Sequence, residues 1–250
     1  MRMLGLDFAD LLMSLQYFYP LTYFIIDINH HICRLTIMTF DELLKYTHNL
    51  KWFDMATVVQ LSDDKRGSIV NQLHRWTRAG KLIDLRRGMY ALAEPFCKSA
   101  INPARLANAL YSPSYLSGLW ALGFYGLIPE SVKVYTSVTS RTPRKFENQV
   151  ACFTYQHVKQ ELFFGYTTAM ISDSEVMLGT PEKALLDLFH LQTGAWTHAR
   201  MREMRFQQQN LIAPDRLMEY AGRFARPRVK MAAELWLEMI KEELAEGIDL

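Results

Sequence analysis

The chain has 250 residues, of which 50% are hydrophobic and 22% are charged, and its formal net charge is +2. This length corresponds to one large domain or two ordinary ones, and the composition excludes an intrinsically disordered chain. A net charge so close to zero gives no general affinity for nucleic acid, so only a local cluster of basic residues could provide it.

The chain has three cysteines, which lie far apart in the sequence, at Cys33, Cys97 and Cys152. None belongs to a CxxC or CxxH pair, which excludes a disulfide framework and a zinc site of ordinary spacing. Separate cysteines of this kind are typical of a reducing compartment, so we expect a cytoplasmic protein.

Residues 1–37 form an apolar and aromatic leader whose longest run covers residues 17–26. A membrane span needs about 20 apolar residues, so this run is too short. A secretory signal is not expected either, because only Arg2 precedes the run and two aspartates interrupt the leader. Two interpretations remain open: an appendage packed on the core, or translation from a start codon upstream of the natural one. We favour the second. Thr-Phe-Asp-Glu after Met38 has the pattern of a capping box, which marks a helix start where an ordinary domain would begin.

A first domain is expected over residues 38–95. Its elements are predicted from apolar periodicity and turn residues. In chain order they are helices over 39–50, 55–61 and 65–79, followed by strands over 81–85 and 89–92. Gly80 ends the third helix, and the strands flank the turn Arg86-Arg87-Gly88. Three helices followed by a hairpin is the order of a winged helix-turn-helix domain, which binds DNA.

A second domain is expected over residues 102–250. Its predicted elements are helices over 102–110 and 114–123, strands over 132–138, 153–157, 162–166 and 169–178, and helices over 180–192, 215–224 and 228–246. The fold class is therefore α+β, with an N-terminal winged helix-turn-helix domain followed by a mixed α/β domain with a helical tail.

The helix predicted over 65–79 carries the clearest functional pattern. Ile69, Leu73 and Trp76 share one narrow face, which leaves the other face polar and basic. Such a helix can enter the major groove of double-stranded DNA, where arginine pairs with guanine, asparagine pairs with adenine, and lysine or serine holds phosphate. The candidate DNA-binding residues, which include two in the predicted wing, are Lys65, Arg66, Ser68, Asn71, Arg75, Arg78, Arg86 and Arg87.

The alternative to a DNA-binding face is an ordinary solvated helix face, since such faces commonly carry basic residues. Against it, residues 65–87 contain seven basic residues and one acid, Asp84, and the basic turn lies where a wing would meet the DNA backbone. His74 on the same helix has no second histidine or cysteine placed beside it. We therefore expect His74 to be an ordinary surface residue.

The segment TPEKALLD at residues 180–187 is the most organised part of the second half. Glu182, Lys183 and Asp187 could be read as catalytic groups. The simpler interpretation is a helix start, with Thr180 as cap, Glu182 favouring the helix dipole and leucines packing. A nuclease would need an acid-x-Lys pair, which neither Asp173 nor Glu175 supplies, and the chain has no GxSxG, P-loop or GxGxxG motif. We expect no enzyme activity, no cofactor and no metal.

Two further basic groups could extend a DNA contact or meet an acidic partner, and a plain solvated surface is the alternative for both. One is a candidate second basic surface in a loop between strands, formed by Arg141, Arg144 and Lys145. The other spans residues 200–230, with eight basic residues against three acids.

Several motifs together resemble the AbiEi family of antitoxins and related regulators. They are RAGKL at 78–82, RGMYAL at 87–92, YSPSYLSGLWAL at 111–122, YGLIPE at 125–130, TSVT at 136–139, FFGY at 163–166 and TPEKALLD at 180–187. The resemblance implies a type IV toxin–antitoxin or phage-defence antitoxin. Its winged helix would repress its own promoter by binding repeats, and its second domain would counteract a nucleotidyltransferase-like toxin without requiring a stable complex. The first 37 residues match nothing in the family pattern.

Other function classes remain open beside this one. The chain could be a stand-alone regulator without a toxin, since many relatives lack one. It could also be a DNA-directed enzyme such as a nuclease with a winged-helix targeting module, or a module that binds other proteins.

Overall fold

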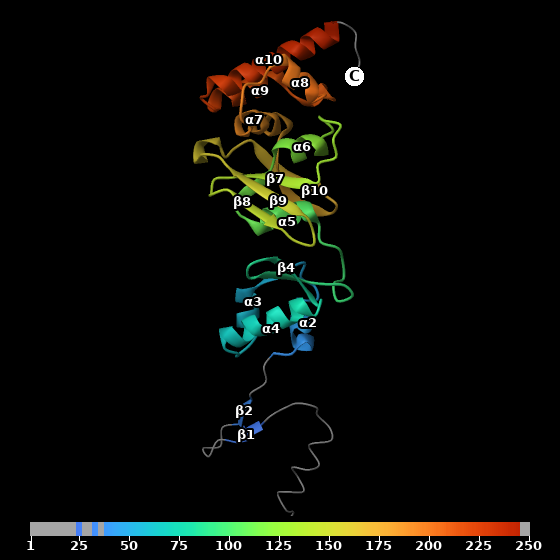
Figure 1. Ribbon diagram of the computed structural model, residues 1–250, viewed down its shortest axis with the longest axis vertical. Helices are drawn as coiled ribbons and strands as arrows, with labels where there is room; N and C mark the ends of the chain where they lie inside the picture. The colour runs from blue at the N-terminus through green and yellow to red at the C-terminus, as the bar shows by residue number, and fades with distance from the viewer. Residues whose placement is uncertain (1–23, 27–31, 35–37, 246–250) are drawn as a thin grey trace, which may run out of the picture. The chain divides into compact units, whose positions relative to one another are not determined.

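The structure is a computed structural model that describes residues 24–26, 32–34 and 38–245 (Figure 1). The fold is α+β, and the described residues divide into two compact units: those up to residue 83 together with 88–98, and residues 84–87 together with 99–245. Strands β1 (Phe24–Ile26) and β2 (Ile32–Arg34) pair antiparallel. Apart from these two strands, the predicted leader lies outside the described residues.

The first unit contains three helices and a three-stranded sheet of order β3-β5-β4. Its elements are α2 (Phe40–Thr47), β3 (Phe53–Asp54), α3 (Met55–Gln60), α4 (Arg66–Arg78), β4 (Leu82–Arg86) and β5 (Met89–Leu92). Residues 84–86 of β4 are grouped with the second unit. The predicted capping box is confirmed: Thr39 Oγ1 accepts from the backbone N–H of Glu42, and the Glu42 carboxylate accepts from the N–H of Thr39 at 2.8 Å. These two bonds satisfy backbone donors that a helix start otherwise leaves free.

The core of the first unit lies between the helices and the sheet. Leu43 of α2, Val58 of α3 and Leu73 of α4 are wholly buried. Trp76 packs edge-on against Phe40, with ring centroids 5.5 Å apart. The apolar stripe of α4 thereby fixes which face of this helix is turned to solvent.

The second unit is built on a six-stranded sheet of order β10-β11-β6-β7-β9-β8. Its strands are β6 (Ser114–Leu116), β7 (Val134–Thr139), β8 (Arg144–Glu147), β9 (Cys152–His157), β10 (Tyr166–Ile171) and β11 (Ser174–Gly179). The pairs β11–β6 and β7–β9 are parallel, and the other neighbours are antiparallel. Residues Ser172 and Asp173, both with positive φ, form the tight turn between β10 and β11.

Helices cover both faces of this sheet. They are α5 (Pro103–Leu110), α6 (Gly118–Phe124), α7 (Pro181–Leu191), α8 (His198–Glu203), α9 (Pro214–Arg223) and α10 (Pro227–Ala245), with 3-10 turns η1 (Gln160–Leu162) and η2 (Gln209–Leu211). Figure 1 shows α6 and α7 on one side of the sheet, α5 on the other, and α8, α9 and α10 stacked beyond α7. This stacking buries α7 on all sides.

Four elements of the second unit differ from the prediction. The helix expected over 114–123 begins with the buried strand β6, and α6 starts only at Gly118, whose φ of +59° accompanies the change of direction. The strand expected over 162–166 is a 3-10 turn and loop, because Gly165 at φ +71° interrupts an extended path. Helix α8 was not predicted. The loop expected around Arg144 and Lys145 is in part the edge strand β8.

Candidate nucleic-acid interface

Helix α4 presents one apolar and one basic face. Ile69, Leu73 and Trp76 are buried, as the periodicity predicts. The residues exposed on this helix, apart from Gly67, are Arg66, Asn71, His74, Arg75 and Arg78, and Ser68 is half-buried. Ala79 follows as C-cap and Gly80, at φ +69°, ends the helix where the sequence places its end.

The basic side chains of this face are free of acidic partners. Among the described residues, no salt bridge involves Arg66, Arg75 or Arg78. Lys65, the N-cap residue, is exposed and makes no side-chain capping bond, so it leaves the first helical N–H groups without a side-chain acceptor. The N–H of Ser68 donates to the carbonyl of Lys65 at 2.8 Å, and the cations Lys65 and Arg66 follow two acids, Asp63 and Asp64. The helix start therefore carries no excess of positive side-chain charge.

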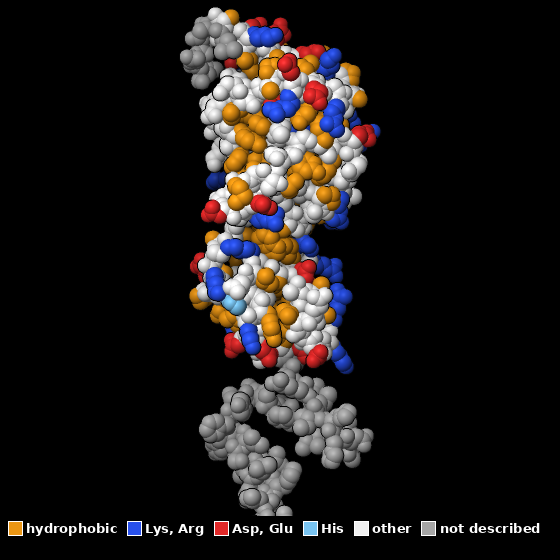
Figure 2. All heavy atoms as spheres, turned by 180° about the vertical axis from the view of Figure 1, so that it is seen from behind, with side chains coloured by type: hydrophobic (Ala, Val, Ile, Leu, Met, Phe, Trp, Pro, Cys, Tyr) orange, Lys and Arg blue, Asp and Glu red, His pale blue; other side chains and the backbone are white. Residues whose placement is uncertain are grey.

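Four of the exposed residues lie together on the surface of α4. Asn71, His74, Arg75 and Arg78 occupy positions i, i+3, i+4 and i+7, and they line one shallow hollow. Figure 2 shows Lys and Arg side chains gathered along one edge of this unit. The set combines bidentate amide and guanidinium donors, which are the groups that read base edges in a major groove.

The predicted wing residues, Arg86 and Arg87, differ from the α4 residues in exposure and in the unit to which they belong. Gly88, at φ +78°, makes the turn between β4 and β5. Arg87 is exposed, whereas Arg86 is half-buried and donates from Nη1 to the carbonyl of Arg87 at 3.4 Å. Residues 84–87 belong to the second unit, so the structure does not group these two arginines with the α4 surface.

The candidate second basic surface, predicted as a solvated loop, is partly engaged in the fold. Arg141 stacks on the ring of Tyr111 at 4.5 Å and donates to the carbonyl of Ser112 at 2.9 Å. Lys145 pairs with Glu147 at 3.3 Å along β8. Arg144 is exposed and forms no ion pair with a described residue, but it interacts with the side chain of Tyr111. The surface therefore carries less free positive charge than its sequence indicates.

The basic stretch over residues 200–230 mainly supports the fold. Arg228 donates to the carbonyls of His190, Gln192 and Gly194, each at 2.7 Å, and so satisfies acceptors at the end of α7. Arg200 stacks on Trp196 at 3.9 Å and donates to the carbonyl of Thr193. These arginines are not available as a DNA-contacting surface.

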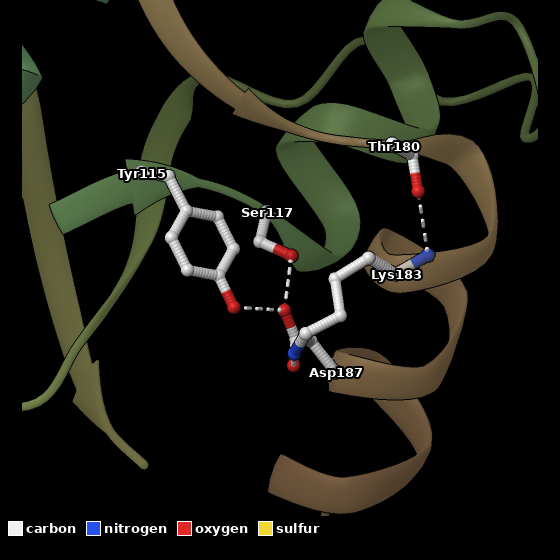
Figure 3. A network of polar contacts seen from close by, with 5 residues as sticks. All are labelled: Tyr115, Ser117, Thr180, Lys183 and Asp187. Carbon is white, nitrogen blue, oxygen red and sulfur yellow. Dashed lines mark hydrogen bonds and ion pairs between the residues drawn. The ribbon is translucent and has the colours of Figure 1, made fainter. Parts of the chain in front are cut away.

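A closed polar cluster lies where α7 meets β6 (Figure 3). Lys183 Nζ pairs with Asp187 Oδ1 one turn further along α7, and both side chains have 0% exposure. The second carboxylate oxygen of Asp187 accepts from Tyr115 Oη at 2.9 Å and from Ser117 Oγ at 2.7 Å. Thr180 caps the same helix by accepting from the N–H of Lys183, as the sequence predicts.

The electrostatics of this cluster follow from its burial. Burial lowers the pKa of Lys183, and the carboxylate of Asp187 opposes this effect. Burial and then Asp187 raise the pKa of Tyr115 well above its usual value of 10.0. The Lys183 ammonium also lies 4.8 Å from the ring centroid of Phe224. Neither side chain of the pair reaches solvent, so the cluster offers no atom to a substrate in this conformation.

Glu182 lies beside this cluster and is also wholly buried. Its Oε1 accepts from the backbone N–H of Ala213 at 3.0 Å and pairs with Arg216 at 2.9 Å. The expectation that Glu182 acts through the helix dipole alone is incomplete, because it also links α7 to the start of α9.

Sequence reasoning overlooked the partners of Asp187. Lys183 and Asp187 are four residues apart on a mainly apolar helix, a spacing that could have indicated a buried pair. Tyr115 and Ser117 precede Asp187 by 72 and 70 residues, and no local signal connects them to it.

Within the described part of the chain, no group of three or more His, Cys, Asp or Glu residues is placed to hold a metal ion. No helix among these residues combines the length and the apolar character that a bilayer span requires. A comparison with models of known protein families finds no match to this chain, and a comparison with curated proteins finds none either.

Proposed function

We propose that this protein is a sequence-specific, double-stranded DNA-binding regulator that represses its own promoter. In this proposal the first unit is a winged helix-turn-helix domain, α4 is its recognition helix, and the hairpin of β4 and β5 is its wing. The observation that carries the proposal is the exposed face of α4, where Asn71, Arg75 and Arg78 lie together and neither arginine forms an ion pair with a described residue. This face has the donor chemistry of direct base readout.

The test is DNase footprinting and a binding titration on the promoter of its own gene. Arg75→Ala or Asn71→Ala should lower the affinity for the specific site about 5- to 100-fold, as expected for a lost bidentate base contact, and change nonspecific binding little. Lys65→Ala should weaken specific and nonspecific binding alike and reduce the slope of log affinity against log salt by about 0.9. Arg105→Ala, an exposed arginine on α5, is the matched control.

Three outcomes would contradict this proposal. Unchanged footprints in the Asn71 and Arg75 variants, with unchanged melting temperatures, would show that α4 does not read DNA. Association with a protein partner that is insensitive to salt, together with no DNA binding, would favour an interaction module instead. Metal-dependent cleavage of the bound DNA would favour the nuclease alternative.

We further propose that the second unit acts as an antitoxin against a nucleotidyltransferase-like toxin and does so without catalysis. The resemblance of residues 111–187 to AbiEi antitoxins is its basis, and the burial of Lys183 and Asp187 supports the absence of chemistry at the TPEKALLD segment. Growth rescue in cells that express a neighbouring toxin tests it. Loss of rescue in a fully stable Glu182→Gln variant would contradict a non-catalytic role. A chain that binds its promoter without rescuing any toxin would be a stand-alone regulator.

A further inference from the structure

Strand β10 forms one edge of the six-stranded sheet, and β11 is the only described strand with which it pairs (Figure 1). The six residue pairs between the two strands follow one another without a bulge. Residues 166–171 contain no charged residue and no proline. Natural sheets usually protect an edge with charges, proline or a bulge, because an open edge can accept a further strand. At the opposite edge β8 has such protection, since Arg144, Lys145 and Glu147 occupy three of its four positions.

The outward backbone groups of β10 belong to Tyr166, Thr168 and Met170. The N–H of Thr180 donates to the carbonyl of Gly165 at 2.9 Å, which makes these two residues a hydrogen-bonded pair of the hairpin. Hydrogen-bonded and non-hydrogen-bonded pairs alternate along an antiparallel ladder. Every second residue from Gly165 onward therefore bonds to β11, and the N–H and C=O groups of the three residues between them point away from it.

The neighbouring strand gives independent evidence for this alternation. Met177 lies opposite Thr168, and it bonds both of its backbone groups to the side chain of Asn108 and not to β10. Its N–H donates to Asn108 Oδ1 at 2.6 Å, and its carbonyl accepts from Asn108 Nδ2 at 3.3 Å. In a non-hydrogen-bonded pair the two residues direct their backbone groups to opposite sides. Thr168 therefore offers a donor and an acceptor at the open edge.

The side chains of the same three residues share one face of the sheet, because side chains alternate along a strand. Met170 is 65% exposed, and Thr168 is exposed as well. Tyr166 is half-buried and stacks on Tyr115, with ring centroids 4.7 Å apart. Open backbone groups beside exposed, uncharged side chains are the properties of a strand that pairs with another chain.

A second copy of the same strand complements this edge. Antiparallel pairing about a two-fold axis at Thr168 would place this residue opposite itself and Tyr166 opposite Met170. Every outward N–H and C=O group of the three residues would then have a partner. The side-chain pairs suit each other, because paired threonines stabilise a sheet and a methionine sulfur packs favourably on an aromatic ring. No charged group of the strand would meet its own copy.

The two ends of this strand carry opposite charges. The same register would direct the exposed turn residue Asp173 of each copy toward the segment that precedes Tyr166 in the other copy. In that segment the ring of Phe164 carries the guanidinium of Arg223, 3.4 Å from its centroid. Asp173 and Arg223 are both exposed, and neither forms an ion pair with a described residue. This complementary charge favours a second copy as the partner.

We propose that the β10 edge is an interface between two copies of this chain, which join their sheets by antiparallel pairing centred on Thr168. The proposal concerns the second unit alone and is independent of the proposed DNA binding. A single pair of strands is a small interface, so we expect a reversible dimer with a dissociation constant in the micromolar range.

Sedimentation velocity of the full chain over a range of concentrations measures this association, and we expect a monomer–dimer equilibrium. Thr168→Lys and Thr168→Glu each place like charges opposite each other at the two-fold axis. Either variant alone should weaken the dimer at least about tenfold. An equimolar mixture of the two variants should recover the dimer, because opposite charges then meet at the axis.

The matched control is Gln156→Lys, which adds the same charge as Thr168→Lys at an exposed position of β9, away from the β10 edge. It should associate like the parent chain. Melting curves that match the parent chain establish that each variant is folded. A parent chain that stays monomeric up to submillimolar concentration would overturn the proposal. A dimer that persists in Thr168→Lys, or a mixture of the two variants that stays monomeric, would show that the copies do not meet at Thr168.

Discussion

The ammonium of Lys183 and the carboxylate of Asp187 face each other one turn apart on α7, and neither is exposed to solvent. Two hydroxyl groups, from Tyr115 and Ser117, complete the carboxylate's hydrogen bonds from β6 and the junction that follows it. Such a pair contributes little net stability relative to apolar residues of the same volume, but removing one partner leaves a buried charge uncompensated.

Asp187→Ala should therefore lower the free energy of unfolding by about 3–5 kcal/mol. Combining Lys183→Met with Asp187→Leu should recover only part of this loss, because Tyr115 and Ser117 then lack an acceptor. Urea denaturation measures both effects. The matched control is Lys230→Ala, which removes an exposed pair with Glu234 at the same i,i+4 spacing and should cost less than about 0.5 kcal/mol. Equal losses at the two sites would contradict the buried pair.

Glu182→Ala should destabilise the second unit by about 2 kcal/mol, because the half-buried N–H of Ala213 loses its acceptor and Arg216 loses its ion pair. Glu182→Gln keeps an amide oxygen for that N–H and should cost less. Asp215→Ala, which removes an exposed first-turn carboxylate of α9, should cost about 0.5 kcal/mol and calibrates the dipole effect alone. If Glu182→Ala costs no more than Asp215→Ala, the link between α7 and α9 is not significant. Thermal and urea unfolding provide the comparison.

His190 makes stability depend on pH. Burial, and then the positive charge of Arg226, lower the pKa of His190 from 6.5 to about 4. Between these two values the unfolded chain binds a proton that the folded chain does not. Stability should therefore be fully present above pH 6.5 and should fall as the pH decreases toward 4. His190→Gln should flatten this part of the curve, and His198→Gln, at an exposed position, should not. Urea unfolding of both variants at a series of pH values measures this difference. An unchanged pH dependence in His190→Gln would contradict the role of His190.

Arg141 and Arg144 should differ in their effect on folding. Arg141→Ala removes a cation–π contact with Tyr111 and a bond to the carbonyl of Ser112, and should cost about 1 kcal/mol. Arg144→Ala, on the edge strand β8, should change stability by less than about 0.5 kcal/mol. Differential scanning calorimetry gives both values. A loss of DNA affinity in the Arg144 variant without a loss of stability would indicate that the second unit also contacts DNA.

The first unit could be predicted from sequence almost element by element, because its signals are local. The cap at Thr39, the helical stop at Gly80 and the turn at Gly88 each determine the backbone within a few residues. The three buried residues of α4 recur at helical spacing, so their burial followed from the pattern alone.

The second unit was less predictable because its signals are long-range. The stretch 114–123 contains small residues and leucines that suit a helix, yet residues 114–116 pair with both β7 and β11 in the middle of the sheet. The pairing with residues more than 60 positions away at Leu178 overrides the local preference. The same holds for Arg228, whose charge suggests a surface contact, whereas its acceptors are carbonyls 34 to 38 residues away in the sequence.

Helix α7 has eight consecutive buried residues, from Glu182 to Phe189. No solvent-facing side of the helix exists through which its amide hydrogens could exchange with deuterium by a local fluctuation. Their exchange requires the surrounding elements to separate, so it reports the opening of the whole second unit. The short helix α8 and the edge strand β8 have no such protection and should exchange through smaller openings. The slowest amides of α7 thus provide an intrinsic measure of the global stability of this unit in the intact chain.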